Sequence, residues 1–241
     1  MIDINCDMGE IDELLDNGTY EALMSYVTSI NVACGAHAGD ERMMRTMVKL
    51  AKKKNVKIGA HPSYPDRENF GRFDLDISDE ELTSSISDQI ACLINIAAEQ
   101  NCSISHVKPH GALYNSAARN EKLATLIGDV IKSIDPSLPI MCLAGSQMVK
   151  TLKSMGMKVL PESFADRTYE PDGSLRKRTY SNALIVDPQV SSLQAYNISN
   201  NKIIAHDGSE ISIESKTLCV HSDTPDALVI AKAIKKKLNR S

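Results

Sequence analysis

Short apolar runs alternate with amphipathic segments along the whole chain, and this alternation predicts the fold. The apolar runs are too short for helices, and several are rich in Val, Ile and Cys. Alternation of strands with helices favours parallel strands joined by right-handed crossovers. The predicted strands are residues 2–6, 30–34, 56–60, 106–108, 140–143, 158–160 and 218–221.

The segments between these strands carry the start signals of helices. Asp40 is a capping residue before an apolar stripe, and Ser78 with Glu81 forms a capping box. Asp187-Pro188 and Thr224-Pro225 each place a capping residue before a proline at the first helical position. We therefore expect helices to begin at these four places.

No linker, internal repeat or low-complexity tract divides the sequence, so residues 1–241 are expected to form a single β/α domain. Two β-prone runs within residues 202–216, joined at Asp207-Gly208, predict a hairpin inserted into it. The fold class is α/β. Seven parallel strands can close into a barrel or form an open doubly wound sheet.

Composition narrows the classes of function. The chain has 27 basic and 31 acidic side chains, and this balance argues against a nucleic-acid binder. No apolar run approaches the ~20 residues that a membrane span needs, and the acidic N-terminus does not resemble a signal peptide. The six cysteines show no paired spacing, so we expect reduced thiols in a cytoplasmic protein, with a nucleophilic Cys6 or Cys34 as the alternative.

Polar side chains suited to catalysis or binding follow nearly every predicted strand. In parallel α/β folds the loops after the carboxyl ends of the strands share one face, and that face holds the active site. Five of the six histidines lie in or directly after strands. The set expected to meet there is Asn5, Asp7, Glu10, His37, His61, Tyr64, Lys108, His110, Glu162, Asp166, Arg167, His221 and Asp223.

Two kinds of chemistry are open to the first members of this set. Imidazole and carboxylate are ligands of Zn²⁺ and similar ions, and Asp7, His37 and His61 follow three successive strands. A purely hydrogen-bonded site is the alternative.

Lys108 and His110 flank a proline, so both side chains point to one face. Lys108 there would bind an anion or stabilise an oxyanion, unless it pairs with a structural acid.

Asp166-Arg167 offers a carboxylate base and a guanidinium that can clamp a carboxylate, with a surface ion pair as the alternative. The sequence contains no GxxxxGKS/T P-loop, no GxGxxG dinucleotide fingerprint, no GxSxG elbow and no HExxH motif. A P-loop kinase, a Rossmann dehydrogenase and a serine esterase are therefore not expected.

Six segments resemble, in chain order, the signature blocks of the LamB/YcsF family. They are INCDMGE, NVACGAHAGD, IGAHPSYPDRENFGR, HVKPHGALYN, ESFADRTYEPDGSLRKR and CVHSDTPDA, and together they span residues 2 to about 227. The resemblance implies a seven-stranded parallel β/α barrel of the glycoside hydrolase/deacetylase type. It also implies ATP-dependent opening of the 5-oxoproline (pyroglutamate) lactam to L-glutamate with two partner subunits, B and C. Homo-oligomer formation stays open.

This reaction assigns roles to the polar set, with acids as general bases, His61 and His110 as proton shuttles, and Lys108 and Arg167 as anion-binding groups. Related deacetylases hold a divalent ion with one Asp and two His, which by analogy suggests Asp7, His37 and His61 as ligands of Mg²⁺, Zn²⁺ or Mn²⁺. Without a P-loop, ATP is expected at an unconventional site or one shared with a partner. The expected catalytic residues are Asp7, Glu10, His61, Lys108, His110 and Asp166, and the expected substrate contacts are Asn5, Tyr64, Arg167, His221 and Asp223.

Ala36, Phe73, Ser163 and Ser222 depart from the Phe, Arg, Gly and Gly that are usual in the family, and the loop 11–20 is shorter. Changes of this kind can reshape the pocket and the choice of substrate. Two other functions compete. One is a stand-alone metal-dependent amide hydrolase or carbohydrate deacetylase that needs no ATP. The other is a non-catalytic subunit that binds a small metabolite.

Overall fold

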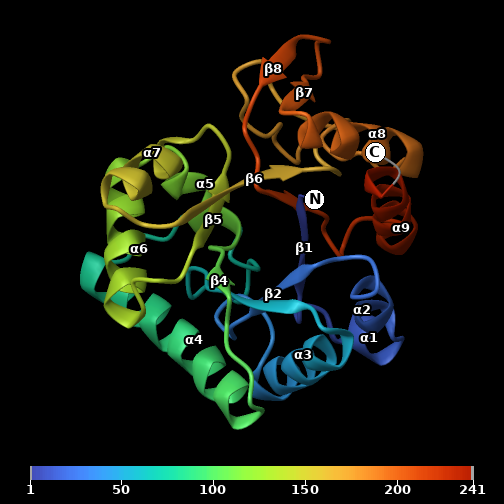
Figure 1. Ribbon diagram of the computed structural model, residues 1–241. Coiled ribbons are helices and arrows are strands. Elements are labelled where there is room, and N and C mark those ends of the chain that lie inside the picture. Colours follow the sequence, from blue (N-terminus) through green and yellow to red (C-terminus); the bar gives the residue numbers. More distant parts are fainter. Residues whose placement is uncertain (1, 240–241) are drawn as a thin grey trace.

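Seven parallel strands close into a barrel, which confirms the predicted strands and excludes the open sheet (Figure 1). The computed structural model describes residues 2–239. Strands β1 to β6 pair in sequence order, and β9 closes the barrel by pairing with both β6 and β1. The barrel strands are β1 (Asp3–Met8), β2 (Ser29–Ala33), β3 (Lys57–His61), β4 (His106–Val107), β5 (Ile140–Leu143), β6 (Val159–Phe164) and β9 (Thr217–Cys219).

Helices surround the barrel, and three of the four predicted start signals are confirmed. The Asp40 carboxylate accepts a hydrogen bond from the backbone of Met43, Ser78 and Glu81 form the capping box, and Asp187 caps the helix that begins with Pro188. The helices are α1 (Asp12–Asp16), α2 (Thr19–Leu23), α3 (Glu41–Lys54), α4 (Asp79–Glu99), α5 (Gly111–Ala117), α6 (Glu121–Ile134), α7 (Gln147–Ser154), α8 (Pro188–Ser199) and α9 (Ala227–Leu238).

The helix start predicted at Thr224-Pro225 is wrong. Helix α9 begins at Ala227, after Asp226, whose φ of 58° places it in the left-handed region. The Thr224 hydroxyl caps no helix and instead donates a hydrogen bond to Asp166 at 2.9 Å. The capping residue and proline therefore mark a turn that belongs to the site described below.

The interior of the barrel is polar directly beneath its carboxyl end. Successive residues of a strand point to opposite sides, so Asn5 and Asp7 of β1 face inward together. The Asn5 side-chain amide donates to Glu162 of β6 at 2.9 Å, and Asn31 of β2 donates to Asp7 at 2.7 Å. His106 of β4 bonds Asn31 at 2.7 Å. These buried bonds cross the barrel and fix the base of the site.

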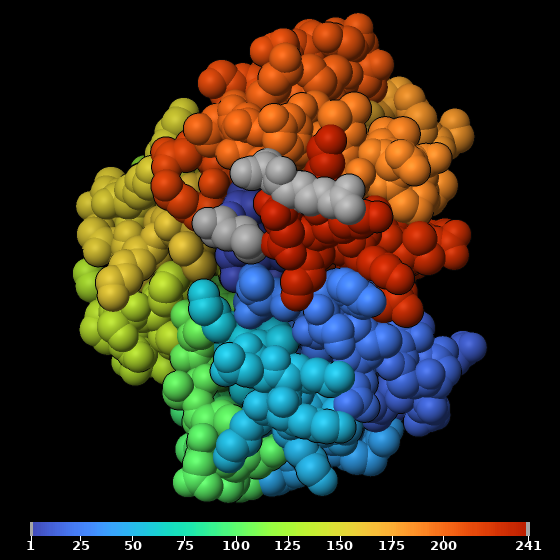
Figure 2. Space-filling view, turned by 45° about the vertical axis from the view of Figure 1, so that its right-hand side comes forward, coloured from blue at the N-terminus to red at the C-terminus, as the bar shows by residue number. Residues whose placement is uncertain are grey.

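The predicted hairpin is confirmed as β7 (Lys202–Ile204) paired antiparallel with β8 (Glu210–Ser212). It lies between α8 and β9 in the chain and forms a separate two-stranded sheet. On the outside of the barrel, α9 packs between α8 and the N-terminal helix α2 (Figure 2). Within residues 2–239, no helix has the length and apolar character needed to cross a membrane.

Candidate active site

A cavity of about 640 Å³ opens at the carboxyl end of the barrel strands. Its wall combines side chains from the ends of β1, β3, β4 and β9 with the long loop that follows β6. This is the face on which the sequence predicted a site. Eight of the predicted residues line the cavity: Asp7, Glu10, His61, Lys108, His110, Arg167, His221 and Asp223.

The other five predicted residues are buried behind the cavity wall instead of lining it: Asn5, His37, Tyr64, Glu162 and Asp166. Asn5 and Asp166 are fully buried and bind other polar side chains of the site. His37 contacts Glu10, and the Tyr64 backbone carbonyl accepts a hydrogen bond from Ser63. In this structure they support the wall from behind.

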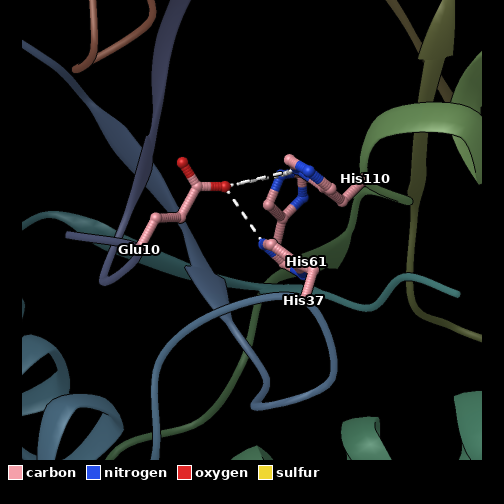
Figure 3. A group of neighbouring side chains, drawn as sticks. All are labelled: Glu10, His37, His61 and His110. Atoms are coloured by element: carbon pink, nitrogen blue, oxygen red, sulfur yellow. Dashed lines mark hydrogen bonds and ion pairs between the residues drawn. The ribbon is translucent and has the colours of Figure 1, made fainter. Parts of the chain in front are cut away.

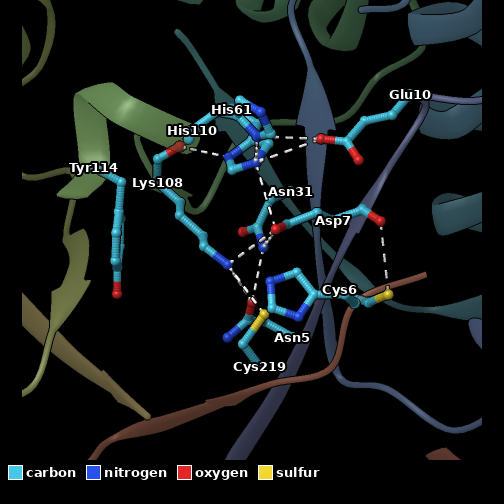
Figure 4. Close-up of polar contacts among 12 residues, drawn as sticks. Asn5, Cys6, Asp7, Glu10, Asn31, His61, Lys108, His110, Tyr114 and Cys219 are labelled. Atoms are coloured by element: carbon cyan, nitrogen blue, oxygen red, sulfur yellow. Dashed lines mark hydrogen bonds and ion pairs between the residues drawn. The ribbon is translucent and has the colours of Figure 1, made fainter. Parts of the chain in front are cut away.

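Lys108 lies at the centre of the site with only 2% of its surface exposed. Its ammonium nitrogen lies 3.0 Å from Asp7 Oδ1 and 3.2 Å from Cys219 Sγ (Figure 4). It also lies 2.9 Å from Glu162 Oε1. Burial alone would lower the pKa of Lys108, but the neighbouring carboxylates outweigh it and hold that pKa well above its usual value. Lys108 is therefore a permanent cation at neutral pH.

Asp7 is the anion that faces this cation. Its Oδ1 accepts hydrogen bonds from Asn31 and Lys108, and its Oδ2 lies 3.5 Å from His61 Nε2. Burial raises the pKa of Asp7, but the charges of His61 and Lys108 outweigh burial and bring it well below the usual value. Asp7 is therefore ionised at neutral pH.

Glu162, which was expected at this face, completes the charge balance around Lys108. It is fully buried; Oε1 accepts from Asn5 at 2.9 Å, and Oε2 accepts from the Tyr114 hydroxyl at 2.7 Å. A buried carboxylate needs such partners to offset its desolvation. The sequence placed Glu162 at the end of the sixth strand but did not name it as a catalytic or substrate-binding residue.

Asp166 and His221 form a second acid–imidazole pair. His221 Nδ1 lies 3.0 Å from both Asp166 oxygens, and the His221 backbone N–H also donates to Oδ2 at 2.9 Å. Burial raises the pKa of Asp166, but the charge interaction with His221 and the hydrogen bonds from His221 and Thr224 outweigh burial and lower that pKa. An imidazole nitrogen of His221 lies within 4.8 Å of an Asp7 oxygen and of Cys219 Sγ. Asp166 thus orients an imidazole toward Asp7.

Three imidazoles and a carboxylate gather in one cluster (Figure 3). His61 connects this cluster to Asp7 at 3.5 Å. Glu10 Oε1 lies 3.1 Å from His37 Nε2 and 3.3 Å from His110 Nδ1, and His61 Nε2 lies 3.0 Å from His110 Nδ1. Burial lowers the pKa of both His37 and His110 well below the usual value. The structure thus groups His37 and His61 with Glu10 and His110, whereas Asp7 groups with Cys219 and His221.

Arginines surround the cavity mouth. Arg72 and Arg178 both lie near Asp223, at 3.4 and 3.6 Å, and Arg176 pairs with Glu170 at 2.8 Å. Arg167 is different, because its guanidinium donates to the backbone carbonyls of residues 183 and 176, and no ion pair between described residues involves it. Its charge is therefore available to an anion in the cavity.

The cysteines offer no support for a nucleophilic thiol. All six are free, and none lines the cavity. Burial raises the pKa of the Cys6 thiol well above its usual value and that of Cys34 to about 12. Both therefore stay protonated near neutral pH, and a protonated thiol is a poor nucleophile.

Of the four positions that depart from the family pattern, only Ser222 lines the cavity. Its hydroxyl donates to the main-chain oxygen of Asp7 at 2.8 Å. Ser163 shares a hydrogen bond with Ser215, and Phe73 is 63% exposed. Ala36 lies outside the wall as well. Ser222 is therefore the one of these four positions that can alter the cavity wall directly.

The fold and the site define a class: parallel β/α barrels with a buried acid, lysine and imidazole site at the strand ends. A model of the LamB/YcsF family matches residues 2–241. The 5-oxoprolinase A subunit of Chloroflexus aggregans is 42% identical to this chain, over 97% of this chain and 93% of its own length. That of Halalkalibacterium halodurans is 43% identical, over 94% and 89%. The chain belongs to the LamB/YcsF family.

Solved structures agree with this membership. The crystal structure of a lactam utilization protein from Thermus thermophilus matches with a TM-score of 0.92 at 34% identity, covering 99% of this chain and 96% of that one. A putative cellobiose-phosphate cleavage protein from Enterococcus faecalis matches with a TM-score of 0.55 at 12% identity, covering 98% of this chain and 93% of that one. The second likeness shows the fold alone.

Proposed function

We propose that this chain acts as the A subunit of a 5-oxoprolinase and binds the lactam ring in the cavity at the strand ends. The reaction is the ATP-dependent opening of 5-oxoproline to L-glutamate, carried out with partner subunits B and C. The observation that carries the proposal is the buried Lys108, held between Asp7 and Glu162 at the cavity wall. The relatives that bear the name of the 5-oxoprolinase A subunit support the choice of reaction.

The substrate offers two recognition groups, a carboxylate and a ring amide. Arg167 can bind the carboxylate with two parallel hydrogen bonds, because its charge has no carboxylate partner among the described residues. The amide oxygen then faces Lys108, which stabilises negative charge that develops there. Both groups line the same cavity, which is large enough for the ring and a phosphoryl group.

ATP is needed because an unstrained five-membered lactam is a stable amide. Transfer of the γ-phosphoryl group to the amide oxygen releases ADP and makes the ring carbon more electrophilic. One water then attacks that carbon, and the ring C–N bond breaks toward nitrogen, which takes up a proton. A second water releases phosphate and leaves L-glutamate. With no P-loop in the chain, we assign nucleotide binding to a site shared with a partner.

Asp7 and His221 are the proton-transfer groups that we infer for this reaction. Asp7 would be the ionised acceptor beside the lactam carbon, and a nitrogen of His221 lies within 4.8 Å of an Asp7 oxygen at the same cavity. Asp166 holds the imidazole of His221 by one nitrogen and leaves the other to give a proton to the departing ring nitrogen. Asp166 is therefore a positioning residue in our scheme.

The compartment that suits this reaction is the cytoplasm. ATP is the co-substrate, and all six cysteines are unpaired, as they are in most proteins of a reducing compartment. We propose no nucleic-acid or membrane partner.

The test combines the purified chain with subunits B and C, ATP and 5-oxoproline, and measures glutamate. We expect Arg167→Met to raise KM by about 10- to 100-fold, because a hydrogen bond to a charged group is worth about 1.5–3 kcal/mol. Arg42→Met removes an exposed cation paired with Asp12 and serves as the matched control. Glutamate formation that does not require this chain would refute the assignment. Turnover without ATP would favour the amide hydrolase.

A further inference from the structure

We propose that Glu10, His37, His61 and His110 form a binding site for a divalent first-row transition-metal ion, with Zn²⁺ the best match. One ligand comes from the carboxyl end of each of the first four strands: after β1, after β2, at the end of β3, and just before α5. The inference rests on the geometry of these four side chains and not on the proposed reaction.

The hydrogen bonds behind the imidazoles fix which nitrogen of each carries the hydrogen. His61 Nδ1 lies 2.7 Å from the Lys108 carbonyl, and His110 Nε2 lies 3.0 Å from the Phe70 carbonyl. A carbonyl only accepts, so both of these nitrogens donate. Each neutral ring then presents a lone pair on its other nitrogen, His61 Nε2 or His110 Nδ1.

The third imidazole is oriented in the same way. Ser63 Oγ donates its hydrogen to the Tyr64 carbonyl at 2.7 Å, so it accepts from His37 Nδ1 at 2.9 Å. His37 Nε2 therefore also presents a lone pair. Hydrogen bonding of the outer nitrogen to a carbonyl or hydroxyl is the usual arrangement behind a metal-bound histidine.

When the three rings are neutral, three lone pairs and one carboxylate oxygen converge. In that neutral state His61 Nε2 and His110 Nδ1, 3.0 Å apart, are two acceptors that repel. Glu10 Oε1 lies 3.1 Å from His37 Nε2, 3.3 Å from His110 Nδ1 and 3.8 Å from His61 Nε2. Ligand atoms about 2.1 Å from a tetrahedral ion lie about 3.4 Å from one another. A positive charge removes this repulsion, either a metal ion at the centre or a proton on His61, whose pKa burial lowers but Asp7 and Glu10 raise overall. The two cases are separated by the binding experiment below.

The donor set also selects the kind of ion. Three neutral imidazoles and one carboxylate suit Zn²⁺ and its first-row neighbours, whereas Mg²⁺ and Ca²⁺ prefer oxygen ligands. His37 and His61 are 1% exposed, and the Phe70 ring packs edge-on against His37 and His110. Glu10, His61 and His110 line the cavity, which gives the ion a route of entry. An ion there would polarise an amide oxygen or a water molecule.

The experiment measures binding of Zn²⁺ to the metal-stripped full-length chain by calorimetry, with elemental analysis for stoichiometry. We expect one ion per chain. Glu10→Gln, which keeps the side-chain size, should weaken Zn²⁺ binding by at least about 100-fold. Ser63→Ala, which removes only the partner of His37 Nδ1, should weaken it by about 10- to 100-fold. His206→Ala alters a histidine outside the cluster, paired with Glu170, and should bind Zn²⁺ normally.

A second measurement reports on the ligands directly. Co²⁺ bound in place of Zn²⁺ should show visible absorption bands of four- or five-coordinate geometry, and these bands should be lost in His37→Ala and His110→Ala. Circular dichroism verifies that each variant is folded. A folded wild-type chain that binds no Zn²⁺, or binding that persists in Glu10→Gln, would overturn the proposal in favour of a proton-shared cluster. Either result leaves the proposed lactam chemistry untouched.

Discussion

Lys108 is the residue on which both the stability and the chemistry of the site depend. Replacement by Met leaves Asp7 and Glu162 as two buried carboxylates without their shared cation. Loss of one partner from a buried ion pair costs about 3–5 kcal/mol, so we expect Lys108→Met to lower the free energy of unfolding by that amount. Glutamate formation should fall by at least about 100-fold, because the oxyanion loses its cation.

Denaturant unfolding and the glutamate assay measure the two effects of Lys108→Met. Lys122→Met is the matched control, since Lys122 pairs with Asp79 at 2.7 Å on the exposed surface. Exposed pairs contribute about 0–1 kcal/mol, so this variant should keep nearly all of its stability and activity. Equal behaviour of the two variants would contradict the central role of Lys108.

His106 should make the fold sensitive to acid. Burial lowers the pKa of His106 to about 4, and an unfolded histidine has a pKa of about 6.5. The unfolded chain therefore binds the extra proton first as the pH falls. The contribution of neutral His106 to stability is complete above about pH 6.5 and is lost as the pH falls toward 4.

The measurement compares the free energy of unfolding at pH 7 and pH 4.5 in the wild type and in His106→Gln. Gln cannot titrate, so the loss of stability between the two pH values should be smaller in the variant. One pKa unit corresponds to 1.36 kcal/mol, so the difference should reach about 2–3 kcal/mol. The same loss in both proteins would show that His106 does not govern the acid response.

At the scale of the elements, Gly59 of β3 leaves the space through which the His106 side chain of β4 reaches Asn31 of β2. In the register of the sheet Gly59 lies opposite His106 on one side and Asn31 on the other. A Cβ at position 59 would overlap His106 Nε2, the atom that binds Asn31. Gly59→Ala should therefore displace the imidazole and destabilise the fold by at least about 1–3 kcal/mol.

Gly128→Ala is the matched control for Gly59→Ala in a thermal unfolding experiment. A Cβ at position 128 would also be close to its neighbours, at 2.8 Å from Leu152 and Met155, but these contacts are the flexible ends of side chains. Alanine also favours helix α6 by about 1 kcal/mol over glycine. We expect little net change in stability for Gly128→Ala. If Gly128→Ala destabilised the fold as much as Gly59→Ala, the loss at Gly59 could not be attributed to displacement of His106.

The strands and most helix starts could be predicted because they depend on local patterns, namely short apolar runs and capping residues. The side of the barrel that carries the site followed from the same reasoning. Asn31 was not predicted because attention to strand ends misses polar residues inside a strand, where they face the barrel interior. Glu162 was expected at the site, but its ion pair with Lys108 was not predicted. The start of α9 was misplaced because Thr224 binds Asp166, a contact between segments 58 residues apart.

The grouping of side chains within the site depends on the paths of loops, which the sequence does not specify. From the sequence alone we could predict that Asp7, His37 and His61 lie on one face of the barrel. The contact between Glu10 and His37 could not be predicted in this way. In the same way, Arg72 and Arg178 meet at Asp223 only because loops from distant parts of the chain converge. Position along the chain predicts the face, and tertiary structure decides the partners.

For the molecule as a whole, the hydrogen bonds of Asp3 that hold the barrel closed lie at one end of the barrel, and the proposed catalytic site lies at the other. At the amino end Asp3 accepts hydrogen bonds from the hydroxyls of Thr28, Ser29 and Thr217, each at 2.7 Å. These bonds tie β1 to the start of β2 and to β9, the strand that completes the ring. The cavity lies at the carboxyl end of the same strands.

Asp3→Ala should therefore weaken the barrel without changing the site. Hydrogen bonds to a charged group contribute about 1.5–3 kcal/mol, and three are lost, so we expect a loss of about 3 kcal/mol or more. For a chain of this size that lowers Tm by roughly 6–12 °C. Below the new Tm, KM for 5-oxoproline in the complex should be unchanged. Asp12→Ala, which breaks only the exposed pair with Arg42, should leave Tm within about 2 °C. A raised KM with an unchanged Tm in Asp3→Ala would contradict this prediction. Hydrogen bonds that only hold the barrel strands together cannot alter substrate binding, so that result would mean that the two ends of the barrel are coupled.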